Sequence, residues 1–292
     1  MKTLLSRMLS MCLCAGWMVP VLCTLRFLLA KCPRKLTLLL WAALGLRLIC
    51  PVTVKTGISI LPQKLTAAPV PPSDFLSVVW MTGTATMLLW GSIRLHRLKA
   101  KLAEAALCGK NVWLCDYLSV PFVLGVIHPK IFLPSSLRPE GAVLVLAHEQ
   151  AHVERYDALW KLLAYLLLCV YWFNPLLWLA YRLFCQDVEM ACDEKVAAQL
   201  TPEARRKYAN VMISCAAPGA PVPGFGGCGL KARIRAVLGY REPPKWAVPA
   251  LVLALMVLSV FFLTDAGADR SQPLYSATDR FFQELYTVAS GK

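Results

Sequence analysis

The residues best suited to catalysis in this chain are two histidines and a glutamate in the sequence HEQAH, residues 148–152. His148 and His152 are four positions apart, and residues at i and i+4 share one helix face, so both imidazoles can reach one metal ion. Glu149 can then serve as general base toward a metal-activated water. Two of the four histidines fall in this motif. The spacing predicts a zinc-dependent protease, and the alternative is a pair of surface histidines on an amphipathic helix.

A zinc site of this type needs at least one more protein ligand and keeps one position open for water. No histidine follows His152, so we expect a carboxylate. Glu189 and Asp193 are again four positions apart, so one helix face presents both. One of them can bind zinc while the other hydrogen-bonds a ligand histidine and holds its ring in place. The alternative for this pair is an ordinary solvated acidic face.

Two further residues near the motifs, Asp157 and Cys192, are weaker candidates for a metal ligand. Asp157 lies five positions after His152, which on a continuous helix rotates it away from the histidine face. We expect it to pair with Arg155 or to end the helix. Cys192 lies next to Asp193, but the chain has no CxxC pair, and we expect its cysteines to be reduced and without a structural disulfide.

The elements that position these residues are expected to lie in a membrane. Apolar residues make up 58% of the chain and charged residues 16%. A bilayer span needs about 20 mainly apolar residues. The candidate spans are Met8–Ala30, Leu36–Pro51, Leu76–Ile93 and Trp246–Leu263. The sequence therefore predicts an α-helical integral membrane protein with four transmembrane helices.

The net charge of +14 is distributed as membrane topology requires. Basic residues follow the first and third spans and precede the fourth, and the positive-inside rule places such segments in the cytoplasm. This divides the chain into an N-terminal membrane region (1–96), a cytoplasmic domain (97–245), a fourth span (246–263) and a short external tail (264–292). We expect no direct contact with nucleic acid.

A fifth apolar stretch, Trp160–Phe184, contains Asn174-Pro175 at its midpoint. If this stretch crossed the bilayer, Glu189 and His152 would lie on opposite sides and could not share a metal. Because proline breaks a helix, we predict a helical hairpin near residues 160–184 that dips into the membrane and returns.

Three short runs before the histidine motif favour β-structure. They are Val112–Leu114, Pro121–Ile127 and Lys130–Pro134, and Pro and Gly residues bound them. We predict a small sheet. Its edge either binds a substrate as an added strand or has only a structural role.

Five segments together resemble the BlaR/MecR-type antirepressor membrane metallopeptidases. They are KCPRKLTLLLWAALGLRLICP, PFVLGVIHPKIFLP, LAHEQAHVERYD, YWFNPLLWLAYRLFCQDVEMACDEKV and LKARIRAVL. The resemblance covers about residues 1–263. It implies a mostly helical, gluzincin-like zinc protease domain, in which His148, His152 and Glu189 bind one Zn²⁺, Glu149 is the general base and Asp193 supports a ligand histidine.

Tyr208 and Arg155 are the two candidates for a donor to the oxyanion of the transition state, and the sequence does not choose between them. A further expectation concerns residues 216–229, which are rich in Gly and Pro and predict a flexible loop. This loop is either an ordinary linker or a site of self-cleavage with Phe225 as its apolar anchor.

The resemblance also implies a function and a location. We expect a multi-pass protein of the bacterial cell membrane that cleaves a cytoplasmic winged-helix repressor, itself, or both; a homodimer is left open. Receptors of this family carry a penicillin-binding-like sensor domain after the last span, and residues 264–292 are too few for a domain of about 50 residues. We therefore expect a sensorless relative. The alternatives are a non-catalytic signalling protein with a structural zinc site and a housekeeping membrane protease.

Overall fold

The computed structural model describes residues 2–30, 32–49, 54–56, 74–215, 229–242 and 244–266. The predictions for the loop at 216–228 and for the tail beyond 266 concern residues outside these ranges. The elements are α1 (Lys2–Leu28), α2 (Arg34–Ile49), β1 (Val54–Thr56), α4 (Asp74–Lys101), β2 (Ala106–Leu107), β3 (Val112–Cys115), β4 (Phe122–Leu124), β5 (Lys130–Pro134), α5 (Pro139–Glu154), α6 (Asp157–Val170), α7 (Pro175–Ala197), α8 (Pro202–Cys215), α9 (Leu230–Leu238), α10 (Ala247–Leu263) and β6 (Thr264–Ala266).

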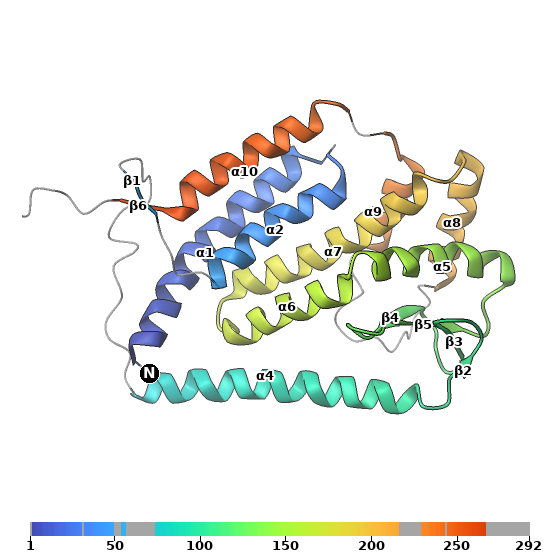
Figure 1. The fold of residues 1–292 in the computed structure, drawn as a ribbon, viewed down its shortest axis with the longest axis horizontal. Helices are drawn as coiled ribbons and strands as arrows, with labels where there is room; N and C mark the ends of the chain where they lie inside the picture. Colours follow the sequence, from blue (N-terminus) through green and yellow to red (C-terminus); the bar gives the residue numbers. More distant parts are fainter. Residues whose placement is uncertain are drawn as a thin grey trace, which may run out of the picture.

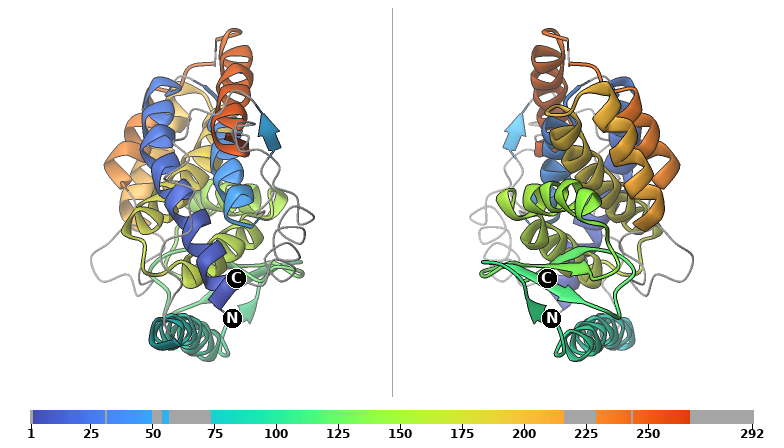
Figure 2. Two further views of the ribbon diagram at one scale, coloured as in Figure 1. Left: turned by 90° about the vertical axis from the view of Figure 1, so that its left-hand side faces the viewer. Right: turned by 90° about the vertical axis from the view of Figure 1, so that its right-hand side faces the viewer.

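Helix α7 lies at the centre of this arrangement (Figure 1). It packs against α1 and α2 on one side and against α5, α6 and α9 on the other. Helix α4 lies along the outside and packs mainly on α6. Figure 2 shows α4 end-on, at the edge of the helices, with the four-stranded sheet between it and α5. The predicted ligand helices, α5 and α7, are therefore neighbours in the interior.

The predicted break at Asn174-Pro175 is confirmed. Helix α6 ends at Val170, and α7 begins with Pro175 in its first turn, where the missing N–H of proline costs nothing. The Asn174 side chain caps α7 by accepting a hydrogen bond from the N–H of Leu176 at 2.9 Å. The two helices pack together as a hairpin, so the chain leaves α5 and returns to it along α7.

The sheet has the strand order β2-β3-β5-β4. The central strand β5 pairs in parallel with β3 and antiparallel with β4, and its apolar residues Ile131, Phe132 and Leu133 are buried. The three predicted runs correspond to β3, β4 and β5. Strand β2 was not predicted, since two residues carry no alternating pattern. The edge strand β4 also packs against α5, so a strand that has only β5 as a partner among the described residues lies beside the helix of the histidine motif.

Two helices within the described residues are long and apolar enough to cross a membrane, Met11–Leu28 in α1 and Asp74–Lys101, which is α4. Helices α2 and α10 are apolar but have 16 and 17 residues. At 1.5 Å per residue they span about 25 Å, less than the hydrocarbon core of about 30 Å. Two of the four expected spans therefore meet the length criterion, and the four-span topology stays a prediction.

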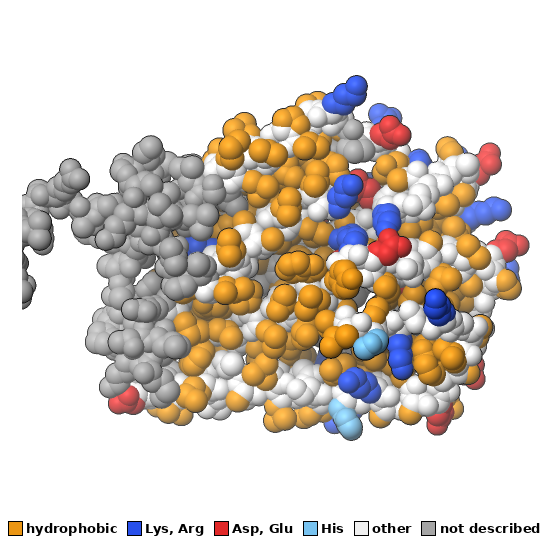
Figure 3. Space-filling model, in the orientation of Figure 1, with side chains coloured by type: hydrophobic (Ala, Val, Ile, Leu, Met, Phe, Trp, Pro, Cys, Tyr) orange, Lys and Arg blue, Asp and Glu red, His pale blue; other side chains and the backbone are white. Residues whose placement is uncertain are grey.

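The surface divides into an apolar and a charged part. Helix α4 exposes ten large apolar side chains: Phe75, Leu76, Val78, Val79, Met81, Leu88, Leu89, Trp90, Ile93 and Leu95. Figure 3 shows hydrophobic side chains over α1, α2, α6 and α10, whereas charged side chains gather toward the end that carries α5, α8 and α9. Exposed apolar residues gathered in this way mark a surface that contacts a membrane or another protein.

The short strands β1 and β6 pair in parallel, with Val54 opposite Thr264. This pairing joins the residues that follow α2 to the residues that follow α10. Both segments therefore lie at the same end of the helices, the arrangement expected if both face the same side of a membrane.

Candidate metal centre

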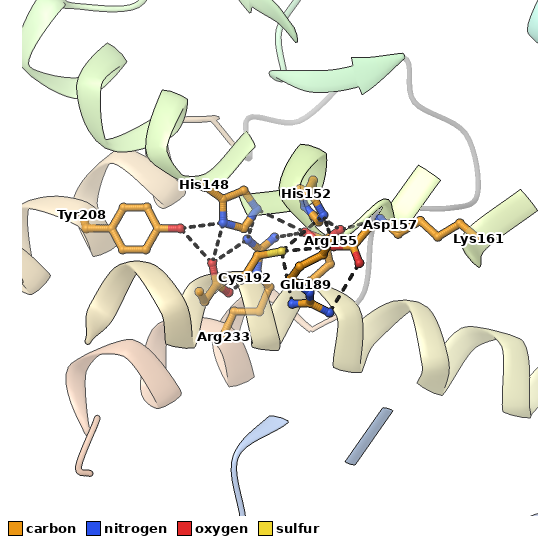
Figure 4. A network of polar contacts seen from close by, with 10 residues as sticks. His148, His152, Arg155, Asp157, Lys161, Glu189, Cys192, Tyr208 and Arg233 are labelled. Atoms are coloured by element: carbon orange, nitrogen blue, oxygen red, sulfur yellow. Dashed lines mark hydrogen bonds and ion pairs between the residues drawn. The ribbon is translucent and has the colours of Figure 1, made fainter. Parts of the chain in front are cut away.

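Helices α5 and α7 bring the two histidines of the motif and Glu189 together (Figure 4). Nε2 of His148 lies 3.6 Å from Oε2 of Glu189, and Nε2 of His152 lies 3.5 Å from Oε1. In a tetrahedral zinc site with bonds of about 2.0 Å, neighbouring ligand atoms lie about 3.3 Å apart. The side chains of His148 and His152 are 8% and 10% exposed. The three side chains thus have the spacing and the burial of a ligand set for one ion.

The other ring nitrogen of His148 faces Asp193 and Tyr208. Nδ1 lies 3.1 Å from Oδ1 of Asp193 and 2.9 Å from the Tyr208 hydroxyl, which donates a hydrogen bond to Asp193 at 2.8 Å. Burial by itself would raise the pKa of Asp193. Hydrogen bonds from Arg233 and His148 have the larger effect together and lower the pKa from its ordinary value to about 2. Asp193 is therefore a carboxylate that can accept a hydrogen bond from an Nδ1–H group of His148, and in that tautomer of the neutral ring Nε2 is the nitrogen that can bind a metal.

The other ring nitrogen of His152 faces a different carboxylate, that of Asp157. Oδ2 of Asp157 lies 2.8 Å from Nδ1 of His152. The prediction that Asp157 points away from the histidine face is therefore wrong, although the expected pairing with Arg155 is present at 3.4 Å. Helix α5 ends at Glu154, Tyr156 adopts a left-handed backbone with φ of 55°, and α6 begins at Asp157. This turn brings the carboxylate back over the histidine.

Cys192 and Asp157 lie on the same side of the His152 ring, the side of Nδ1, whereas Glu189 lies near Nε2. Its Sγ is 3.3 Å from Nδ1 of His152 and 3.3 Å from Oδ2 of Asp157. Burial and the nearby Asp157 charge raise the pKa of the Cys192 thiol. Because zinc binds thiolates, this environment disfavours Cys192 as a ligand.

Two cations at the centre were not predicted from the sequence. Lys161 Nζ lies 2.9 Å from Oε1 of Glu189, and Arg233 Nη1 lies 3.2 Å from Oε2. Arg233 also binds Asp193 with two nitrogens, at 2.6 and 2.9 Å. Burial raises the pKa of Glu189, but Lys161 and His152 lower it to well below its ordinary value. Glu189 is thus ionised, and each of its two oxygens faces a cationic side chain.

Only one of these two cations, Lys161, had a signal in the sequence. Lys161 is one of two charged residues in the apolar stretch Trp160–Phe184, and a charge in such a stretch usually has a buried partner. Arg233 lies in the LKARIRAVL segment among other basic residues, and nothing in their order distinguishes it.

The remaining predicted residues lie close to the ligands. Tyr208 is engaged with Asp193 and His148, while Arg155 contacts Asp157 and has Nη1 3.6 Å from Cys192 Sγ. Both support the Nδ1 sides of the histidines, and their role as transition-state donors stays a prediction. Glu149 is buried in α5, with 5% of its surface exposed.

A helical fold that buries an HExxH motif against a glutamate on a second helix defines a candidate peptidase of the metal-dependent class. Residues 72–230, more than half of the chain, match the BlaR1 peptidase M56 family. The chain belongs to this family, and the family suggests metallopeptidase activity.

The chain is similar to proteins named as regulatory and resistance proteins. It is 30% identical over 158 residues to "Regulatory protein BlaR1" of Bacillus licheniformis, which covers 46% of this chain and 26% of the relative. It is 24% identical over 170 residues to "Methicillin resistance mecR1 protein" of Staphylococcus aureus, covering 54% of this chain and 28% of the relative. The chain thus spans about a quarter of the length of these relatives.

Proposed function

We propose that this protein is a membrane-embedded zinc endopeptidase that acts in signal transduction. The observation that carries the proposal is the convergence of two Nε2 atoms and one carboxylate, with a further carboxylate behind each imidazole. Imidazole and carboxylate are ligands that zinc accepts, and a carboxylate on the far ring nitrogen orients each imidazole. His148, His152 and Glu189 would hold one ion.

The chain's own residues would carry out the proton transfers and hold the substrate. A bound zinc ion supplies Lewis acidity, which polarises the scissile carbonyl and makes water more acidic. Glu149 accepts the proton of the attacking water and passes it to the leaving amine. Edge strand β4 beside α5 offers main-chain groups to a substrate in extended conformation. Tyr208 and Arg155 remain the candidates for a donor to the oxyanion.

The proposed substrate is a cytoplasmic winged-helix repressor, the chain itself, or both. The names of the relatives, a regulatory protein and a resistance protein, favour a signalling role over general proteolysis. The alternative is a housekeeping protease that degrades unfolded proteins.

We expect the purified full chain, loaded with zinc in detergent, to cut a winged-helix repressor from the same organism at one or a few bonds. Cleavage should stop when a chelator removes the metal, because the proposed reaction depends on the Lewis acidity of the ion. Mass spectrometry of the fragments is the measurement, with an unfolded protein as the comparison substrate. An intact repressor alongside a thoroughly degraded unfolded protein would favour the housekeeping alternative.

We further propose that the chain is a multi-pass protein of the bacterial cell membrane, with four spans and residues 97–245 in the cytoplasm. The apolar surface of α4 and the gathering of charges at the end with α5, α8 and α9 support it. The pairing of β1 with β6 fits an external position for both segments.

Reporter fusions after Glu154 and after Leu200 should both report the cytoplasmic side. The reason is that α6 and α7 form a hairpin, so the chain enters and leaves it at the same end. A fusion after Thr56 should report the external side and serves as the control. Signals from opposite sides for Glu154 and Leu200 would contradict both the topology and a metal shared by α5 and α7.

A further inference from the structure

Helix α7 carries a second pair of carboxylates on the face opposite the metal centre. Asp187 and Glu194 are seven positions apart, which on an α-helix is about two turns, so they share one side. Asp187 is two positions from Glu189, a rotation of about 200° around the helix axis. One side of α7 therefore presents Glu189 and Asp193 to α5, and the other presents Asp187 and Glu194 to α1 and α2.

Asp187 is completely buried, and both of its carboxylate oxygens accept hydrogen bonds from the N-terminal helices. Arg26 of α1 donates from Nε to Oδ1 at 2.9 Å and to Oδ2 at 2.8 Å. Trp41 of α2 donates from its indole nitrogen to Oδ2 at 2.8 Å. Arg34 adds a weaker contact, with Nη1 3.8 Å from Oδ1. A single carboxylate thus joins α7 to both N-terminal helices.

Glu194 makes a second connection about two helical turns further along α7. Its Oε2 accepts a hydrogen bond from the backbone N–H of Arg34 at 2.6 Å, at the start of α2. Hydrogen bonds to a charged group are short and strongly directional. Two such contacts on one side of a helix restrict both its rotation about its axis and its displacement along it.

We infer that Asp187 is a positioning residue, which sets the rotation of α7 against α1 and α2 and thereby holds Glu189 at the distance from His148 and His152 that a metal ion requires. The inference rests on the proposed metal centre. Because a helix rises 1.5 Å per residue, Glu189 lies only about 3 Å along the axis from Asp187. A small rotation at Asp187 therefore moves the Glu189 carboxylate directly. Metal affinity is in this way tied to the packing of the N-terminal helices.

The test is the zinc affinity of full-length Asp187→Asn protein, purified in detergent and titrated against a chromophoric chelator well below its unfolding temperature. Asparagine keeps the shape of the side chain and loses the charge that Arg26 binds. We expect zinc to bind about tenfold or more weakly, the size of effect seen when residues behind metal ligands are changed. Trp41→Phe, which removes one donor and keeps an aromatic ring, should weaken binding in the same direction by less.

The control is Leu251→Ala. Leu251 is buried in the same helical core, and its apolar side chain can form neither a hydrogen bond nor an ion pair with Asp187. It should lower the unfolding temperature and leave the zinc affinity unchanged. If Asp187→Asn and Trp41→Phe lower the unfolding temperature but bind zinc as tightly as the wild type, Asp187 is only a structural residue and the inference is overturned. A wild-type protein that binds no zinc, or binds it independently of Glu189, would instead refute the metal centre itself.

Discussion

Replacing Glu189 by alanine is expected to weaken zinc binding by more than about 100-fold and to abolish peptide cleavage. The change removes one of three ligands, and losses of about 10- to 100-fold already follow from changes behind the ligands. The change also removes the carboxylate that lies between Lys161 and Arg233. The positive charges of these two side chains then repel a metal ion. Zinc content after dialysis and the rate of substrate cleavage are the two measurements.

A graded series makes this prediction specific. Glu203→Ala changes a glutamate in the exposed first turn of α8 and should bind and cleave like the wild type. Asp157→Ala should lie between the two, with zinc bound about 10- to 100-fold more weakly, since it removes the carboxylate from Nδ1 of His152. An undiminished zinc affinity in Glu189→Ala would show that another residue completes the ligand set.

Replacing Glu149 by glutamine is expected to lower the cleavage rate by about 10²- to 10⁴-fold while one zinc ion per chain stays bound. Glutamine has the size of glutamate but cannot accept the proton of the attacking water, and general base catalysis contributes about this much. The three ligands are untouched, so the metal should remain. Single-turnover cleavage and zinc content, measured on the same preparation, separate the two effects.

This variant also distinguishes a protease from a non-catalytic protein with a structural zinc site, which does not require Glu149. Full cleavage by Glu149→Gln would refute its role as the base. Loss of zinc would show that Glu149 acts in metal binding. Thermal unfolding provides the control, because a buried glutamine that disturbs α5 would lower the unfolding temperature as well.

Much of the centre follows from spacing within single helices. His148 and His152 share a face because they are one turn apart, and the same rule pairs Glu189 with Asp193. The break at Asn174-Pro175 follows from the chemistry of proline and an asparagine cap. These are local effects, which a sequence states directly, and the requirement that both helices share a metal then predicts the hairpin between them.

The residues that sequence analysis misplaced depend on how the helices end and meet. Asp157 reaches His152 because Tyr156 takes a left-handed conformation, and a non-glycine residue gives little warning of this. The lengths of α2 and α10, by contrast, follow the sequence closely: the apolar runs Leu36–Pro51 and Trp246–Leu263 have 16 and 18 residues, and the two helices have 16 and 17.

The sequence by itself determined the chemical type of the centre and the family resemblance, because both depend on residue identity and local spacing. Only the tertiary structure decided which cations neutralise Glu189 and which side of α7 meets the N-terminal helices. Lys161 and Arg233 are 28 and 44 positions from Glu189, and Arg26 is 161 positions from Asp187. Contacts over such separations arise from the packing of whole helices, and no local pattern in the chain specifies them.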